Sequence, residues 1–264
     1  MISRYELTLS PPDGTALSPD CAYRLYSWLL SRIPEEQGEA LHSQEDHPIS
    51  QYLSCSRSGG PGVWHIALLN DAAHELFVPV LENVRSIDLH TGTLAVSAIN
   101  HEAGKTPKEI ILSGRAANTG RASLQFVSPA SFRQAGRYVI YPQEKLIIGS
   151  LVKRWNSFCP EYRMDDEDAL QMLENSVRIT DYSLRTVRFR LKNALISCFT
   201  GKITLSAGLP LPLAELWNAL LCWAEYSGIG IKTALGMGGV QVSLPALREP
   251  ASCERNTGKL SATS

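Results

Sequence analysis

The sequence has no long run of apolar residues, and this absence excludes a helical membrane protein. No stretch approaches the roughly 20 consecutive apolar residues that a transmembrane helix needs. The first residues, MISRYELTLSPPDG, contain no apolar segment of the kind that a signal peptide carries. We therefore expect a soluble, cytoplasmic protein without a membrane partner.

Closely spaced cysteine pairs are also missing. The six cysteines are scattered along the chain, and none forms the CxxC motif that many zinc sites use. Because the cytosol keeps thiols reduced, we interpret these cysteines as buried small hydrophobic residues. The sequence thus predicts no metal site.

Neither sign of charge is in excess. The chain has 25 Lys and Arg residues against 26 Asp and Glu residues, so its formal net charge is -1. A nucleic-acid-binding domain often has a pI above about 9, and the total charge argues against that class. Only one patch has to face the phosphates, however, so the local distribution of charge matters more than the total.

The familiar nucleotide-binding motifs are absent from the glycine-rich segment, which we define as Gly228–Val240. It has no Gly-Lys-Ser/Thr sequence of a P-loop, and Thr233 stands where a dinucleotide-binding fingerprint needs its third glycine. Backbone N–H groups in such a segment can hold phosphates, and Lys232 would add a cation. A flexible hairpin before an edge strand is the alternative that the spacing leaves open.

The pattern of predicted elements indicates two domains. The 264 residues are 44% hydrophobic, which is enough for two cores at roughly 100–150 residues per domain. Each half follows a β-α-β-β-α-β order, which is typical of an α+β, ferredoxin-like domain. The patterns predict strands at 5–9, 51–56, 63–69, 94–99, 110–112, 123–127, 177–191, 195–207 and 239–244, and helices at 18–33, 71–82 (bent or interrupted by Pro79), 144–158, 165–175 and 213–226.

These elements divide the chain into four regions. We expect an N-terminal ferredoxin-like domain over 1–127 and a C-terminal one, with the glycine-rich loop, over 143–249. The segment 128–142 is rich in Pro, Gly and Ser and predicts a linker. The polar segment 250–264 predicts a disordered tail.

Four segments of the second half, in order, resemble one known family. They are FVSPASFRQAG, GSLVKRWNSF, ISCFTGKITLSA and YSGIGIKTALGMGGV. The chain is similar here to the CRISPR-associated endoribonucleases that process repeat RNA, in the repeat-associated mysterious protein superfamily. The resemblance implies tandem ferredoxin-like domains, no cofactor, and metal-independent cleavage of CRISPR precursor RNA within repeats. It also implies products with 2′,3′-cyclic phosphate and 5′-hydroxyl ends, which become mature guide RNAs.

That reaction needs groups that move protons and a cation that stabilises the phosphorane. The resemblance places a catalytic histidine at His42, which follows leucine soon after the first long helix. Where the family carries a lysine a few residues further on, this chain has His47-Pro48-Ile49-Ser50. His47 is then a second catalytic group or a simple loop residue. Tyr26 either corresponds to a family tyrosine on the first helix or belongs to the core.

Basic residues without acidic neighbours predict where RNA would bind. From Tyr182 to Ala214 the chain has five basic residues and no acidic residue, and Arg188 and Arg190 share strand parity and therefore one face. A solvated strand face is the alternative. The candidate RNA-binding residues are Lys153, Arg154, Arg185, Arg188, Arg190, Lys192, Gly228, Gly230, Lys232, Gly236 and Gly238.

Three functional readings remain open at this point. The first is an endoribonuclease acting on repeat RNA, alone, as a homodimer or in a CRISPR effector complex. The second is a non-catalytic RNA-binding subunit of such a complex. The third is an unrelated ferredoxin-like domain that binds protein or small molecules, because a fold by itself does not determine function.

Overall fold

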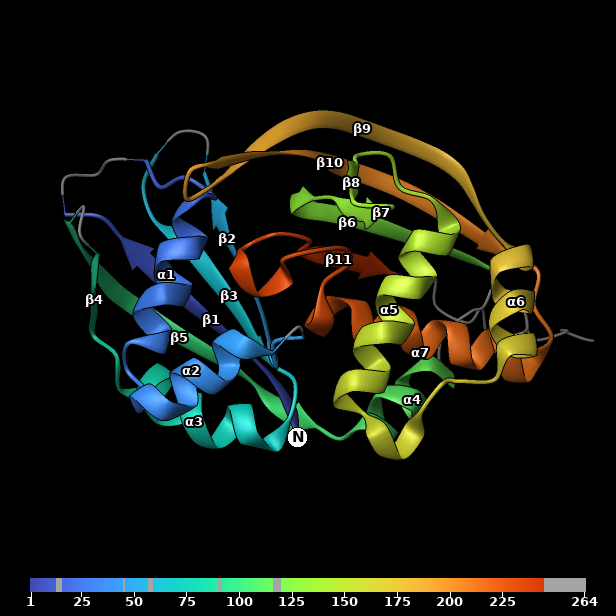
Figure 1. Ribbon diagram of the computed structural model, residues 1–264, viewed down its shortest axis with the longest axis horizontal. Coiled ribbons are helices and arrows are strands. Elements are labelled where there is room, and N and C mark those ends of the chain that lie inside the picture. Colours follow the sequence, from blue (N-terminus) through green and yellow to red (C-terminus); the bar gives the residue numbers. More distant parts are fainter. Residues whose placement is uncertain (13–15, 45, 57–58, 90–91, 116–119, 245–264) are drawn as a thin grey trace, which may run out of the picture.

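The computed structural model describes residues 1–12, 16–44, 46–56, 59–89, 92–115 and 120–244, with only the backbone of His42 and Ser43 (Figure 1). The predicted tail at 250–264 lies outside these residues. The elements are β1 (Ile2–Ser10), α1 (Cys21–Leu30), α2 (Glu35–Ser43), β2 (Ile49–Cys55), β3 (Gly62–Leu68), α3 (Asp71–Asn83), β4 (Ser86–Leu89), β5 (Gly92–Lys105), α4 (Pro107–Arg115), β6 (Arg121–Ala130), β7 (Phe132–Gln134), β8 (Arg137–Val139), α5 (Glu144–Phe158), η1 (Pro160–Tyr162), α6 (Glu167–Ser176), β9 (Val177–Leu191), β10 (Ala194–Ala207), α7 (Leu211–Ser227), η2 (Thr233–Leu235) and β11 (Val240–Ser243).

The first sheet has the strand order β2-β3-β1-β5-β4, with antiparallel neighbours. Without the edge strand β4, this is the ferredoxin-like order, in which the first strand lies between the third and the fourth. Alternation along β1 buries Tyr5, Leu7 and Leu9. These side chains share a core with residues of α1 and α3, so the sheet and its helices form one hydrophobic unit.

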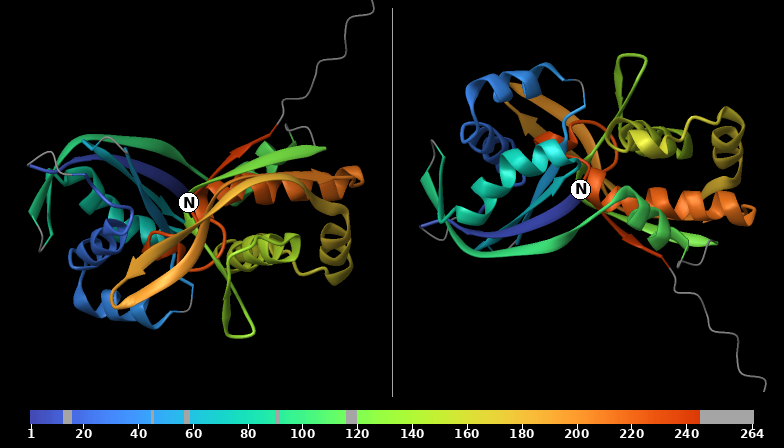
Figure 2. Two further views of the ribbon diagram at one scale, coloured as in Figure 1. Left: turned by 90° about the horizontal axis from the view of Figure 1, so that it is seen from above. Right: turned by 90° about the horizontal axis from the view of Figure 1, so that it is seen from below.

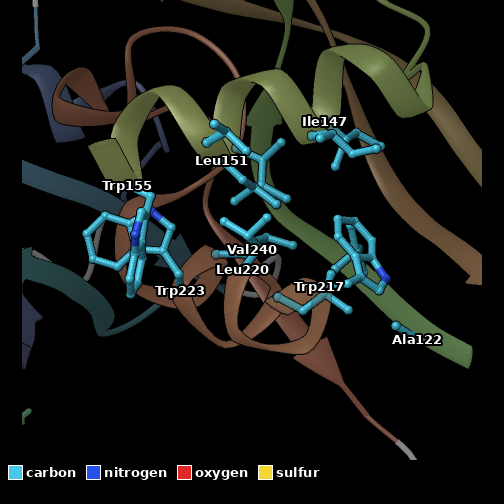
Figure 3. Close-up of a cluster of buried hydrophobic side chains, with 14 of the residues drawn as sticks. Ala122, Ile147, Leu151, Trp155, Trp217, Leu220, Trp223 and Val240 are labelled. Carbon is cyan, nitrogen blue, oxygen red and sulfur yellow. The ribbon is translucent and has the colours of Figure 1, made fainter. Parts of the chain in front are cut away.

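The second sheet repeats that arrangement with the order β11-β6-β10-β9. Its core lies between the strands and two helices, α5 and α7, where Trp155, Trp217 and Trp223 are almost fully buried (Figure 3). The indole rings of Trp155 and Trp223 meet edge to face, with ring centroids 5.6 Å apart, which is a favoured aromatic geometry. The predicted α+β fold of two tandem ferredoxin-like domains is confirmed.

The predicted strand at 110–112 is wrong, because these residues lie in helix α4. Thr106 and Glu109 form a capping box: the backbone N–H of Thr106 donates to Glu109 Oε2 at 2.7 Å, and the N–H of Glu109 donates to Thr106 Oγ1 at 3.2 Å. The backbone of α4 approaches α7 so closely that a Cβ on Gly114 would lie 2.6 Å from the backbone N of Ala219. The capping box and the contact with α7 favour a helix more strongly than the short apolar pattern at 110–112 favours a strand.

The expected end of the first domain at residue 127 falls inside strand β6. This strand pairs with β10 and β11, so it belongs to the second sheet from Arg121 onward. The expected linker over 128–142 contains the end of β6 and the β7–β8 hairpin. Helix α3 also continues through Pro79 without interruption. The domain boundary and the linker were misplaced because they depend on strand pairing between distant segments, which local patterns do not reveal.

Candidate active site and nucleic-acid interface

The glycine-rich segment is a buried joint between the two domains. It follows α7 and enters β11 of the second domain, yet its short helix η2 packs against β2 and α1 of the first. The buried amide of Gln51 makes this joint: Nε2 donates to the carbonyl oxygens of Ala22 at 3.0 Å and Ala234 at 2.9 Å, and Trp64 Nε1 donates to Oε1 at 2.9 Å. Both groups of the amide are therefore satisfied.

Close packing explains the glycines of this segment. A Cβ on Gly236 would lie 2.5 Å from Ala22 Cβ, and the backbone there has φ +106°, a conformation that other residues rarely adopt. Gly228, Gly236 and Gly238 are all buried. Their role as RNA contacts stays a prediction. The segment does precede an edge strand, β11, as the hairpin alternative has it, but it forms the short helix η2 and packs against both domains.

Lys232 is the one exposed residue of this fully described segment. Its backbone has φ +57°, which is uncommon for a residue with a side chain and is often found at functional sites. Its carbonyl oxygen accepts hydrogen bonds from the N–H groups of Leu235 at 2.9 Å and Met237 at 3.3 Å. The segment therefore presents a lysine from a rigid backbone.

Two clefts meet where the first domain touches this lysine. The larger, of about 840 Å³, lies between α5, the β7–β8 hairpin and the glycine-rich segment. The smaller, of about 610 Å³, lies between α1 and the turn that joins β9 to β10. His47, Lys232 and Leu235 line both clefts. A half-buried imidazole and an exposed ammonium group thus border the same concave surface.

His47 is held by a tyrosine from the first helix. Tyr26 Oη lies 3.2 Å from His47 Nδ1, and the rings meet edge to face. Burial raises the pKa of Tyr26 to about 12, so the phenol keeps its proton at neutral pH. The ring of Tyr26 lies in the core, as one of the two predicted alternatives has it. Its hydroxyl contacts His47, and its correspondence to a family tyrosine stays a prediction.

The second domain fixes the backbone around His47 through helix α5. Arg154 is buried, and its Nη2 lies 3.5 Å from the carbonyl oxygens of His47 and Ile49. Burial lowers the pKa of Arg154 to about 10, which still leaves the guanidinium charged at neutral pH. On the same helix, Lys153 Nζ lies 3.5 Å from Asp46 Oδ1. These contacts make α5 a support for the His47 segment.

The larger cleft has an excess of positive charge. Lys145 Nζ lies 3.3 Å from Glu174 Oε2, but the other cleft residues include only one further carboxylate. Sequence analysis missed Lys145 and Arg133, because both lie in or next to a segment that looked like a linker. The charged residues that line this cleft, His47 apart, are Arg133, Lys145, Lys153, Arg154, Lys232, Asp46 and Glu174.

The predicted basic strip on β9 divides between two faces of the strand. Arg188 and Arg190 are exposed on one face, as their parity predicts. Arg185 lies on the other, where its Nε donates to Thr200 Oγ1 at 3.1 Å and where Lys202 lines the same shallow cavity. Only part of the predicted strip can therefore contact one RNA strand at a time.

The β9–β10 hairpin crosses from the second domain to the first (Figures 1 and 2). The N–H of Arg190 donates to Asp20 Oδ1 at 3.1 Å, and Lys192 Nζ lies 5.6 Å from the ring centroid of Tyr23. Lys192 also lines the smaller cleft. The fold brings five of the predicted RNA-binding residues together at the two clefts: Lys153, Arg154, Lys192, Gly230 and Lys232.

The backbone of His42 lies near the end of α2, a helix that sequence analysis did not predict. Its side chain is outside the described residues, so its catalytic role stays a prediction. The described part of the chain contains no group of three or more His, Cys, Asp or Glu side chains suited to a metal ion. Among the same residues, no helix is long and apolar enough to cross a membrane.

Comparison with known proteins gives consistent results. Residues 124–240 match the family model described as "CRISPR-associated endoribonuclease Cas6". The Cas6 of Streptococcus thermophilus is 28% identical over 224 residues, covering 84% of this chain and 91% of that protein. The Cas6 of Mycobacterium tuberculosis is 27% identical over 255 residues, covering 94% of this chain and 80% of the other.

Solved structures share the fold. A Cas6 product complex has a TM-score of 0.78 at 21% identity, over 92% of this chain and all of the other. Thermus thermophilus Cas6 has a TM-score of 0.72 at 21% identity, over 92% of this chain and 98% of the other. Taken together, these comparisons show that the chain is similar to Cas6 endoribonucleases in sequence and in fold.

Proposed function

We propose that this protein cleaves CRISPR precursor RNA within its repeats, by attack of a ribose 2′-oxygen on the adjacent phosphorus and without a metal ion. The products are a 2′,3′-cyclic phosphate and a 5′-hydroxyl. The observation that carries the proposal is the meeting of His47, held by Tyr26, with Lys232 at the edge of a positively charged cleft. The endoribonuclease names of the curated relatives support the substrate.

The chemistry divides among residues of both domains. His42 and His47 transfer the two protons, one from the 2′-hydroxyl and one to the leaving 5′-oxygen, which contributes about 10²–10⁴-fold. His47 carries a proton on Nδ1 and donates it to Tyr26 Oη, which orients the ring and leaves Nε2 to take or give the transferred proton. Lys232 takes the place of the missing family lysine and stabilises the negative phosphorane, a contribution of about 10²–10³-fold. The basic side chains of the larger cleft hold the phosphates of the bound strand.

One assay tests the reaction. Labelled RNA that contains the repeat of the organism's own CRISPR array is incubated with the protein in EDTA under single-turnover conditions. We expect one cut per repeat, and no cut when the nucleotide before the cleavage site lacks its 2′-hydroxyl. His42→Ala should bind the RNA normally and cleave it at least about 100-fold more slowly.

The same assay distinguishes the alternatives. Tight binding of the repeat without cleavage by the wild-type protein would indicate a non-catalytic subunit of an effector complex. Failure to bind the repeat at low salt would contradict both RNA-directed functions. Two further properties stay predictions. Sedimentation can test assembly as a homodimer or within an effector complex, and cell fractionation can test a cytoplasmic location.

A further inference from the structure

Three tyrosines of the second domain are unusually exposed for aromatic residues. Tyr138 is 49% exposed, Tyr141 is 50% exposed and Tyr182 is 58% exposed. Tyr138 lies on β8, Tyr141 just before α5, and Tyr182 on β9. Tyr141 and Tyr182 meet edge to face, with centroids 6.0 Å apart and an interplanar angle of 89°. An edge-to-face contact covers one face of one ring only, so it leaves the other ring faces open to a ligand.

Tyr138 connects this group of tyrosines to the positively charged cleft. Tyr138 is the direct partner of Arg133 in the β7–β8 hairpin, so both side chains share one face, and Arg133 lines the cleft. Figure 2 shows this hairpin projecting from the body of the protein beside α5. Residues 128–143 include two arginines and no acidic residue. The hairpin therefore offers cations and aromatic rings together.

We propose that Tyr138, Tyr141 and Tyr182 form a stacking platform for unpaired bases of the RNA strand that the cleft holds. Open aromatic rings beside a basic groove are how proteins bind single-stranded nucleic acid, because every base has a π-face that can stack. The inference rests on the proposed function only in taking RNA as the ligand. It adds a binding site for nucleotides outside the cleavage position.

A second copy of the chain fits the patch less well. A stable protein interface needs about 800 Å² from each partner, whereas three half-exposed tyrosines supply roughly 300 Å². Ile140, at 39% exposed, is the exposed large aliphatic residue between Tyr138 and Tyr141 in the sequence. The arginines of the hairpin also favour a polyanion over another hydrophobic surface.

The test uses a single-stranded oligoadenylate in which one base is 2-aminopurine, titrated with the full-length protein in EDTA. Stacking quenches the fluorescence of this base. We expect the Tyr141→Ala/Tyr182→Ala variant to lose the quenching and to bind about tenfold more weakly. Tyr141→Phe/Tyr182→Phe should bind as the wild type does, because the ring faces remain. Tyr162→Ala, at an exposed tyrosine in η1, is the matched control.

An abasic strand of the same length separates stacking from charge, and it should bind wild type and double-alanine variant equally. Unchanged oligoadenylate binding by the double-alanine variant would overturn the platform. So would an equal loss for the abasic strand, or a shift from dimer to monomer in sedimentation. Because the assay measures binding alone, a protein that stacks bases but fails to cut repeats would contradict the proposed function and leave the platform intact.

Discussion

At the scale of single residues, the site depends on side chains whose conformations are fixed by burial. Tyr26 is 2% exposed, and its hydroxyl reaches His47. Lys232 is exposed, but its backbone is held because its carbonyl oxygen accepts hydrogen bonds from the N–H groups of Leu235 and Met237. In each case a packed core sets the position of one polar group, which is the preorganisation that catalysis requires.

Tyr26→Phe is the sharpest test of the contact to His47. The substitution keeps the ring in the core but removes the hydrogen-bond partner of His47 Nδ1, so the imidazole is no longer oriented by that contact. We expect single-turnover cleavage to fall about tenfold, as a part of the proton-transfer contribution, with RNA affinity unchanged. Tyr23→Phe, three positions earlier on the same helix, should cleave at the wild-type rate. Equal rates for both variants would remove Tyr26 from the mechanism.

Lys232→Gly separates catalysis from stability. Glycine adopts φ +57° without strain, so the free energy of unfolding should stay within about 1 kcal/mol of wild type. Cleavage at saturating RNA should fall about 10²–10³-fold, because the phosphorane loses its cation, and Lys232→Arg should restore much of the rate. Urea unfolding and single-turnover kinetics measure the two effects. A variant that cleaves normally once saturated would assign Lys232 to binding alone.

At the scale of elements, the glycine-rich segment acts as a joint and α5 as a support. Gly236 approaches α1 so closely that no side chain fits. Arg154 reaches from α5 to the backbone of His47, across 107 positions in the sequence. The glycine-rich segment therefore contributes mainly geometry, with Lys232 as its one exposed residue.

A pair of glycine variants measures the joint. Gly236→Ala combines positive φ with a contact to Ala22 and should lower the free energy of unfolding by about 2–4 kcal/mol. Gly136→Ala also has positive φ, at +77°, but its Cβ would meet nothing within 4 Å, so it should cost only about 1 kcal/mol. Chemical denaturation compares them. Equal losses would show that backbone strain, and not the packed joint, explains the glycine.

At the scale of the whole molecule, the two domains enclose the clefts and share a polar cluster. Glu102 of β5 forms an ion pair with Arg4, whose Nη2 lies 2.9 Å from the carboxylate. It also accepts a hydrogen bond of 2.8 Å from the hydroxyl of Tyr226, at the end of α7. These contacts, like the Gln51 hydrogen bonds, connect the first sheet to the segment that carries Lys232. The distance between the proposed catalytic groups thus depends on how the domains are joined.

The surface that binds RNA can be identified from the salt dependence of affinity. Each phosphate contact contributes about 0.7 to the slope of log affinity against log salt for a single strand. Arg133→Ala removes a cleft cation and should lower the slope by about that amount. Arg185→Ala, on the opposite face of β9 from Arg188 and Arg190, should leave it unchanged. The reverse result would place the RNA on the shallow cavity of the second sheet.

Acid should destabilise the whole fold before the carboxylates titrate. Burial lowers the pKa of His65, and burial with the nearby N-terminus lowers the pKa of His74. The unfolded chain therefore binds more protons, so stability is highest above the ordinary histidine pKa of about 6.5 and falls as the pH drops through it. Urea unfolding at pH 7.5 and 5.5 measures the loss. His65→Gln should reduce it, and an unchanged loss would exclude His65 as a source.

Local patterns predicted most elements well, and their limits have physical causes. The bounds of α5 and β9 follow from periodicity alone, because each is long and strongly patterned. Residues 110–112 were wrongly predicted as a strand, because the capping box at Thr106 stabilises a helix there. Arg133 and Lys145 escaped notice because nothing local shows that a hairpin and a helix start border a common cleft.

The sequence by itself determined the class of the fold, the family resemblance and the residue types that RNA cleavage requires. These depend on composition, periodicity and ordered motifs, which are local properties of the chain. Only the tertiary structure decided that β6 belongs to the second sheet, that the glycines are a buried joint, and that Tyr26, His47, Arg154 and Lys232 meet. These facts depend on contacts between distant segments, such as Gln51 and Ala234, which lie 183 positions apart and meet only when both cores have formed.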